Sequence, residues 1–296
     1  MRIAHATDIH WFVPPKLLDL RSFKRTLGTA NLYLRGRRHH FPEVVQARVV
    51  EFLRALSPDL VCLTGDLTST ALPAEFAKAR AALEPLLSTI PTFIIPGNHD
   101  VYTVGAQREA RVQAWFGDWM FLGEGGIGMA DFGTTTVLGL DPNRPTRISA
   151  SGVLPQGQLQ ALEAALRRPD LAERTVVLAI HYPLFDRMGR LYDNWEHGLQ
   201  NVNDLVAILS AAPRRPDLIL HGHEHRGYRS ELQLADGVRI PVFNSGSSGY
   251  ANPAKDRGAA VNLYRVEVGK PVEVERYLHG PDGFAPEPGG AYATGR

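Results

Sequence analysis

Five short polar clusters along the chain combine carboxylate, imidazole and amide side chains, which are ligand types found around first-row transition metals. Pooled, the clusters supply three or four imidazoles, two carboxylates and one amide oxygen. This set is too large for one tetrahedral zinc ion and too rich in nitrogen for calcium or magnesium. Two first-row ions that share a carboxylate fit it better, and manganese, iron and zinc all remain open. The candidate ligands are Asp8, His10, Asp66, Asn98, His181, His223 and His225.

Two of the clusters contain ligand pairs with a spacing suited to one ion. Asp8 and His10 are two residues apart, and His223 and His225 repeat that spacing. In extended chain, side chains two residues apart leave the same face, so each pair can reach a single ion.

Apolar runs of strand length precede the clusters and must position them. The runs are continuous rather than alternating, which is typical of strands buried on both faces of a sheet. In open α/β sheets, ligands bind beyond the carboxyl ends of the strands, and the clusters stand at that place in the sequence. The clearest runs cover residues 60–63, 92–95, 176–180 and 218–220, and helical spacing is found from residue 42, over 72–88, from 155 and over about 200–212.

The remaining pattern predicts an α/β layered fold with an antiparallel C-terminal section. Residues 126–140 read as a strand pair that turns at 131–133, and short strands follow over 238–243, 259–268 and 272–277. We expect residues 1–279 to form a single domain. The Gly-, Pro- and Ala-rich residues 280–296 predict an extended or disordered tail.

Together the clusters resemble the motifs of the calcineurin-like metallophosphoesterases. The resemblance spans residues 1 to about 250, and it implies an α/β/β/α sandwich with mixed sheets and a metal site at the strand carboxyl ends. Each block alone is common by chance, but all five stand in the right order after apolar strands. The blocks are Asp8-x-His10, Gly65-Asp66, Gly97-Asn98-His99-Asp100, His181 and Gly222-His223-Glu224-His225.

The resemblance also implies a role for each residue. A water or hydroxide between two ions, manganese being favoured over iron or zinc, would attack phosphorus. His99 would donate a proton to the leaving group or stabilise charge on the phosphate, and Asp100 would orient His99 by accepting its other ring N–H. The implied ligand sets are Asp8, His10 and His225 for one metal, Asn98, His181 and His223 for the other, and Asp66 as the bridge.

Other glycines and polar residues near the clusters are expected to be structural. Gly65, Gly97 and Gly222 would permit tight turns at strand ends. The turn formed by residues 244–247, Asn-Ser-Gly-Ser, would back the last cluster by packing.

Residues 14–41 form a basic and apolar insert directly after the first cluster, and we expect it to lie beside the metals. It carries seven basic residues against one acid, Asp19, whereas the whole chain has a net charge of only +1. Three interpretations remain open: a helix pair packed on the sheet, a lid or peripheral contact with an anionic membrane, and a nucleic-acid surface. The basic residues are Lys16, Arg21, Lys24, Arg25, Arg35, Arg37 and Arg38.

Composition excludes several classes of protein. With 32 Lys+Arg against 31 Asp+Glu in 296 residues, the chain is not built to coat nucleic acid, and no nucleic-acid partner is expected. The single Cys62 excludes an intramolecular disulfide framework. No apolar run approaches the ~18–20 residues of a membrane span, and the N-terminus lacks a signal-peptide pattern. We therefore expect a cytoplasmic protein, at most peripheral to the inner membrane face.

The motifs leave the substrate open within phosphoester chemistry. They predict hydrolysis of a phosphodiester or pyrophosphate bond in a nucleotide or lipid-linked substrate. The insert favours an amphiphilic substrate such as that of the UDP-diacylglucosamine pyrophosphatases, although one such group has Arg in place of His99. A cyclic-nucleotide phosphodiesterase is the alternative, and a non-catalytic scaffold is disfavoured because every ligand position is filled.

Overall fold

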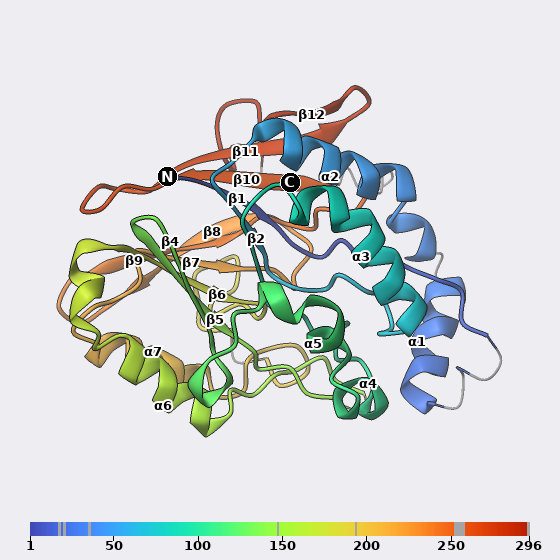
Figure 1. The fold of residues 1–296 in the computed structure, drawn as a ribbon, viewed down its shortest axis with the longest axis horizontal. Coiled ribbons are helices and arrows are strands. Elements are labelled where there is room, and N and C mark those ends of the chain that lie inside the picture. The colour runs from blue at the N-terminus through green and yellow to red at the C-terminus, as the bar shows by residue number, and fades with distance from the viewer. Residues whose placement is uncertain are drawn as a thin grey trace.

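Two six-stranded mixed sheets face one another across a shared core, and helices cover their outer faces (Figure 1). The computed structural model describes all residues except 17, 18, 20, 21, 35, 36, 147, 193, 252–257, 295 and 296. The arrangement confirms the predicted α/β/β/α layering with mixed sheets.

The first sheet has the strand order β12-β11-β10-β1-β2-β3. Its β1, β2 and β3 run parallel, while β10, β11 and β12 add antiparallel neighbours at the other edge. The strands are β1 Arg2–Ala6, β2 Leu60–Leu63, β3 Thr92–Ile94, β10 Ala260–Arg265, β11 Glu273–Gly280 and β12 Gly283–Pro286.

The second sheet has the order β4-β5-β6-β7-β9-β8. Its four central strands are parallel, and β4 and β8 pair antiparallel at the two edges. The polar edge strand β8 was not predicted from the sequence. The strands are β4 Gly128–Phe132, β5 Thr135–Leu140, β6 Thr175–Ile180, β7 Leu218–His221, β8 Tyr228–Gln233 and β9 Arg239–Asn244.

Helices α2 and α3 pack on the first sheet, and α6 and α7 pack on the second (Figure 1). No helix among the described residues combines the length and apolar character needed to cross a bilayer. The α-helices are α1 Phe23–Leu34, α2 Glu43–Leu56, α3 Pro73–Leu87, α4 Val104–Arg108, α5 Arg111–Phe116, α6 Gln156–Ala165 and α7 Val202–Ala211. The short 3-10 helices are η2 Arg37–His40, η3 Gly117–Trp119, η4 Glu124–Gly126 and η5 Pro169–Glu173.

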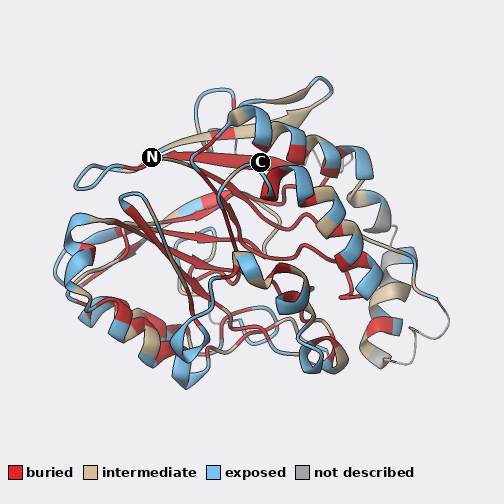
Figure 2. Ribbon diagram, viewed as in Figure 1, coloured by how far each residue is buried: buried red, intermediate tan, exposed pale blue. Residues whose placement is uncertain are grey.

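Burial explains why the predicted strands form where they do. Strands β2, β5, β6 and β7 are buried at every position (Figure 2), and for β2, β6 and β7 this agrees with the continuous apolar runs of the sequence. Their inward side chains meet those of the opposite sheet in the shared core, where Cys62, Phe93 and Val177 are among the buried residues. The cysteine is therefore a packing residue.

The predicted extended or disordered tail is wrong for residues 283–294. Strand β12 pairs with β11, and the chain then returns to the core (Figure 1). Glu287, only 4% exposed, forms an ion pair with the buried Arg276 at 3.0 Å and accepts the Tyr292 amide at 2.7 Å. The Tyr292 hydroxyl contacts Asn262 Nδ2 at 2.6 Å. The composition did not predict this ordered segment, because the buried ion pair and the pairing of β12 with β11 hold it in place despite its Gly and Pro content.

Candidate metal centre

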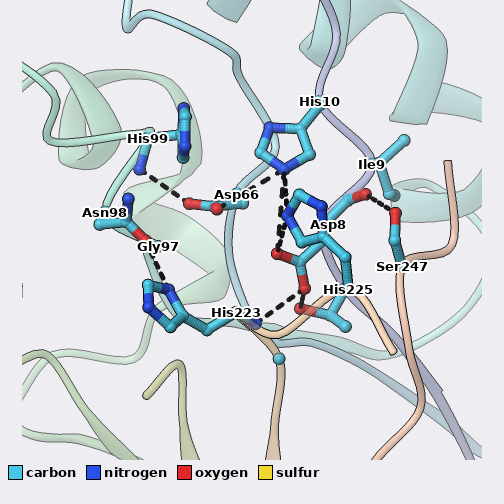
Figure 3. Close-up of polar contacts among 12 residues, drawn as sticks. Asp8, Ile9, His10, Asp66, Gly97, Asn98, His99, His223, His225 and Ser247 are labelled. Atoms are coloured by element: carbon cyan, nitrogen blue, oxygen red, sulfur yellow. Dashed lines mark hydrogen bonds and ion pairs between the residues drawn. The ribbon is translucent and has the colours of Figure 1, made fainter. Parts of the chain in front are cut away.

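All seven candidate ligands meet where the carboxyl ends of parallel strands from both sheets approach one another. Figure 3 labels all of them except His181. This is the location predicted from the sequence, and it lies between strands that are almost wholly buried. Asp8 and His10 follow β1, Asp66 follows β2, Asn98 follows β3, His181 follows β6, and His223 and His225 follow β7.

Asp8, His10 and His225 form the first ligand group; one ligand atom from each of them and one from Asp66 lie within 4.8 Å of one another. His10 Nε2 is 3.1 Å from His225 Nε2 and 3.8 Å from Asp8 Oδ1. The same Asp8 oxygen is 3.2 Å from His225 Nε2. Because His10 Nδ1 donates a hydrogen bond to the Thr68 carbonyl at 3.2 Å, Nε2 is the nitrogen left to face the group.

Asn98, His181 and His223 form the second ligand group. His181 Nε2 and His223 Nδ1 lie 3.1 Å and 2.8 Å from Asn98 Oδ1, and 3.3 Å from each other. His181 Nδ1 donates to the Thr64 carbonyl at 2.7 Å, which fixes the ring with Nε2 toward the group. A backbone carbonyl thus orients one imidazole in each group.

Asp66 lies between the two groups. Its Oδ2 is 3.6 Å from His10 Nε2 in the first group and 3.4 Å from His181 Nε2 in the second. Its Oδ1 accepts the backbone N–H of His99 at 2.8 Å (Figure 3). One carboxylate therefore reaches both groups.

Left-handed backbone is concentrated at the ligands. Such φ values are uncommon outside glycine and cost roughly 1–3 kcal/mol each, and they cluster at functional sites. Five of the seven candidate ligands adopt them: Asp8 (φ 53°), His10 (57°), Asp66 (55°), His223 (74°) and His225 (52°).

Two glycines allow the ligand loops to touch. A Cβ atom on Gly97 would collide with the backbone and carboxylate of Asp66, and one on Gly222 would collide with Thr7 and lie 2.5 Å from Asp8 Oδ2. Neither has a positive φ, so close approach, rather than the predicted turn geometry, requires glycine there. Gly65, at φ 96°, does fit the turn expectation.

Two imidazoles of the site, those of His10 and His223, are in the neutral form that metal binding needs. Burial lowers the pKa of His10 well below its ordinary value, and burial together with the charge of His181 lowers that of His223 to about 3. His181 differs: burial disfavours its charged form, but the nearby Asp66 outweighs burial and raises its pKa to about 9. A metal must therefore displace a proton from His181 at neutral pH.

Both carboxylates of the site are ionised. Burial favours the neutral acid, but the attraction of His225 and His181 outweighs it and lowers the pKa of Asp8 to about 2. The pKa of Asp66 is likewise held well below its ordinary value, because His181 and His99 outweigh burial.

The donor set fits a pair of divalent metal ions. Asp8 Oδ1 is buried without a hydrogen bond of normal geometry in the part of the chain that the structure describes. Facing imidazole nitrogens, such as those of His10 and His225 at 3.1 Å, direct lone pairs toward shared points. Imidazole, carboxylate and amide donors in two groups joined by Asp66 are the ligands of first-row divalent metals.

His99 stands at the edge of the ligand groups, but Asp100 does not orient it. His99 Nδ1 donates to the Ser69 carbonyl at 2.6 Å, and its ring packs against His10 with the centroids 4.8 Å apart. The Asp100 carboxylate instead accepts the amides of Thr68 (2.7 Å) and Leu67 (3.2 Å). The predicted orienting role of Asp100 is therefore wrong; Asp100 ties together the loops that follow β2 and β3.

The 244–248 loop does more than pack behind the last cluster. Ser247 Oγ donates to the Asp8 carbonyl at 2.6 Å (Figure 3), and Asn244 Nδ2 donates to the Gly222 carbonyl at 2.8 Å. The Tyr292 hydroxyl in turn donates to the Asn244 carbonyl at 3.2 Å. The loop thus connects both pairs of spaced ligands to the C-terminal segment, a connection with no local signal in the sequence.

The insert lies beside the first ligand group, as predicted. Phe41 packs its ring edge on His10 and His225, with centroids 4.5 Å and 5.7 Å away. Arg25, 7% exposed, anchors α1 by donating to the Thr70 carbonyl and Thr103 Oγ1, each at 3.4 Å. Of the insert's predicted basic residues, Arg21 and Arg35 lie outside the described residues.

Comparison with known sequences finds one matching family. The family model described as Calcineurin-like phosphoesterase matches residues 1–227. A protein named "Probable cyclic nucleotide phosphodiesterase" from Synechococcus sp. is 25% identical over 242 residues, which is 82% of this chain and 80% of that protein. A Danio rerio "Transmembrane protein with metallophosphoesterase domain" is 32% identical over 113 residues, 35% of this chain, and the match spans only 24% of its length.

Solved structures share the fold at low sequence identity. A dimetal phosphatase from Danio rerio superposes with a TM-score of 0.57 at 14% identity, covering 96% of this chain and 95% of that one. A purple acid phosphatase from yellow lupin (Lupinus luteus) superposes with a TM-score of 0.58 at 15% identity, covering 94% of this chain and 51% of that one.

Proposed function

The chain belongs to the calcineurin-like phosphoesterase family of metal-dependent phosphoric ester hydrolases, and we propose that it hydrolyses phosphodiester or pyrophosphate bonds with a pair of divalent metal ions. The observation that carries this proposal is the position of Asp66. Its buried carboxylate reaches an imidazole in each ligand group, at 3.6 Å and 3.4 Å. A carboxylate shared in this way suits two ions held side by side.

The proposed ligand sets follow the two groups. Asp66 would be shared by both ions. When bound, the ions supply Lewis acidity, which lowers the pKa of a bound water toward neutrality and stabilises negative charge on phosphoryl oxygens. Manganese is the ion we propose for testing, because imidazole and carboxylate donors both suit it. Asp8, His10 and His225 would hold one ion, and Asn98, His181 and His223 the other.

His99 would serve the leaving group. Its Nδ1 proton is held by the Ser69 carbonyl, so Nε2 is the nitrogen that would exchange a proton with the leaving oxygen. Its backbone N–H holds Asp66, so this one residue connects the bridging carboxylate to the proton donor. Asp100 would act indirectly by holding the loop amides of Thr68 and Gly97.

A nucleotide phosphodiester is the substrate class we place first. The Synechococcus relative aligns over most of both chains and is named for cyclic nucleotides. We also propose a cytoplasmic location, which agrees with a single buried cysteine.

A lipid-linked pyrophosphate at a membrane surface is the second candidate, and the insert favours it. Helix α1 exposes the apolar side chains of Leu27 (44%), Tyr33 (41%) and Leu34 (86%), which suits contact with the apolar part of a lipid, and the insert as a whole has a net positive charge. Retention on anionic liposomes at low salt would support this candidate, and absence of retention would remove it.

The activity is tested with manganese-loaded protein and two chromogenic esters. We expect bis-p-nitrophenyl phosphate to be hydrolysed faster than p-nitrophenyl phosphate, and Asp66→Ala to lose both metal and turnover. A metal-loaded protein that turns over neither ester would instead be the non-catalytic scaffold. A monoester preference would overturn the phosphodiesterase assignment while leaving the metal site intact.

A further inference from the structure

A cavity of about 520 Å³ opens between helix α1, the segment after Asp100 and the loop after β5. Its volume is in the range of small-molecule sites. No role in metal binding or in the chemistry described above accounts for it. We call it the Lys24 cavity; its lining includes Ser22, Lys24, Tyr102, Val104, Thr146 and Ile148.

Tyr102 connects this cavity to the proposed proton donor. Its ring stacks on His99, with centroids 5.3 Å apart and planes 21° from parallel. The Lys24 ammonium lies over the same Tyr102 ring, 4.7 Å from its centroid. One aromatic ring therefore separates the cationic side of the cavity from the edge of the metal centre.

Among the described residues, Lys24 has neutral hydrogen-bond partners only. Its Nζ donates to Thr146 Oγ1 at 3.0 Å and to the Ser149 carbonyl at 3.4 Å, and no carboxylate pairs with it within the described part of the chain. Burial lowers its pKa to about 8, so the ammonium form carries a desolvation cost that no anion offsets. An anionic ligand would supply the missing partner.

The rim of the cavity is apolar and exposed to an unusual degree. Val104 is 69% exposed and Ile148 is 85% exposed, although both are large aliphatic side chains. Exposed apolar side chains around a hollow next to a reactive centre are typical of a ligand site. The cavity thus offers a cation for one group and an apolar wall for a neutral organic part.

Building on the activity proposed above, we propose that the Lys24 cavity binds the organic group of the substrate. Lys24 pairs with a second anionic group that this organic part carries, on the other side of the Tyr102 ring from His99. Within the nucleotide phosphodiesters proposed above, the cavity therefore favours those that carry a further phosphate or carboxylate over singly charged esters and simple cyclic nucleotides, which lack such a group.

A matched pair of substrates tests this proposal. The p-nitrophenyl ester of thymidine 5′-phosphate is compared with the same ester carrying an additional 3′-phosphate, using manganese-loaded protein. We expect wild type to prefer the 3′-phosphorylated ester by about tenfold in kcat/KM, mainly through KM, as a charged hydrogen bond would give. Lys24→Met should reduce this ratio to about one, whereas Lys24→Arg should retain most of it.

Lys16→Met is the control, because it removes the same charge from an exposed position of the same insert and should keep the wild-type ratio. An unchanged ratio in Lys24→Met, or no preference in wild type, would overturn the proposal. If neither ester is hydrolysed, the proposed activity fails, and the cavity is tested by equilibrium dialysis with thymidine 3′,5′-bisphosphate. Tighter binding to wild type than to Lys24→Met would then support it, and equal binding would refute it.

Discussion

Replacing His99 with alanine separates proton donation from metal binding. The alanine variant keeps the backbone N–H that donates to Asp66 Oδ1 at 2.8 Å, so the bridging carboxylate keeps its partner. What it loses is the imidazole, whose Nδ1 proton is fixed by the Ser69 carbonyl at 2.6 Å. We therefore expect normal metal content in the variant and a specific loss of acid catalysis.

The size of that loss should depend on the leaving group. A positioned general acid contributes about 10²–10⁴ in rate, equivalent to about 3–5 kcal/mol in the transition state. For an ester with an alkoxide leaving group, which needs the proton, the variant should lose this full factor in rate. For a nitrophenyl ester, whose nitrophenolate leaves unprotonated, the rate should fall roughly tenfold or less.

The assay is kcat/KM for a series of phosphodiesters of increasing leaving-group pKa, measured for wild type and His99→Ala with elemental analysis of each protein. The variant should show a steeper dependence on leaving-group pKa at unchanged metal content. An equal loss for every ester, or loss of metal from the variant, would refute the proton-donor role.

The remaining predictions concern the site and its support. The pKa of His181 is raised from 6.5 to about 9, so the charged imidazole stabilises the metal-free protein. This stabilisation is complete below pH 6.5 and is lost as the pH rises through 9. The Tm measured in chelator should fall over that range, while metal affinity measured by titration should rise; a flat affinity profile would contradict this. Arg276→Met leaves the buried Glu287 unpaired and should cost about 3–5 kcal/mol in urea unfolding, and a loss below about 1 kcal/mol would show that the C-terminal segment does not depend on the pair. Gly222→Ala should push the Asp8 carboxylate aside and weaken metal binding at least tenfold, as measured by calorimetry. Gly117→Ala is the control, because its added methyl group meets open space, and it should bind metal as wild type does. Equal metal affinities in the two variants would contradict the close approach of Gly222 to Asp8.

The fold and the meeting of the seven candidate ligands could be predicted because both depend on patterns that the sequence carries directly. Continuous apolar runs indicated buried strands, and the polar clusters stood at strand ends, where parallel strands converge. The position of Asp66 between the two metal sites was implied by the resemblance to the metallophosphoesterases, and in the structure it follows β2, the strand that pairs with β1.

The supporting contacts could not be predicted, because their partners are generic or distant. The Ser69 carbonyl orients His99, and any residue at that position would present a carbonyl. The ion pair between Arg276 and Glu287 joins residues in a segment whose Gly and Pro content resembles a disordered tail. The contact between Tyr102 and Lys24 depends on how the insert folds back, which no local pattern reports.

Anomalous diffraction from manganese-soaked crystals would show whether Asp66 joins two metal sites. We expect two manganese peaks per chain, one beside Asp8, His10 and His225 and one beside Asn98, His181 and His223, with the Asp66 carboxylate contacting both. A single peak, or two peaks of which only one contacts Asp66, would contradict it.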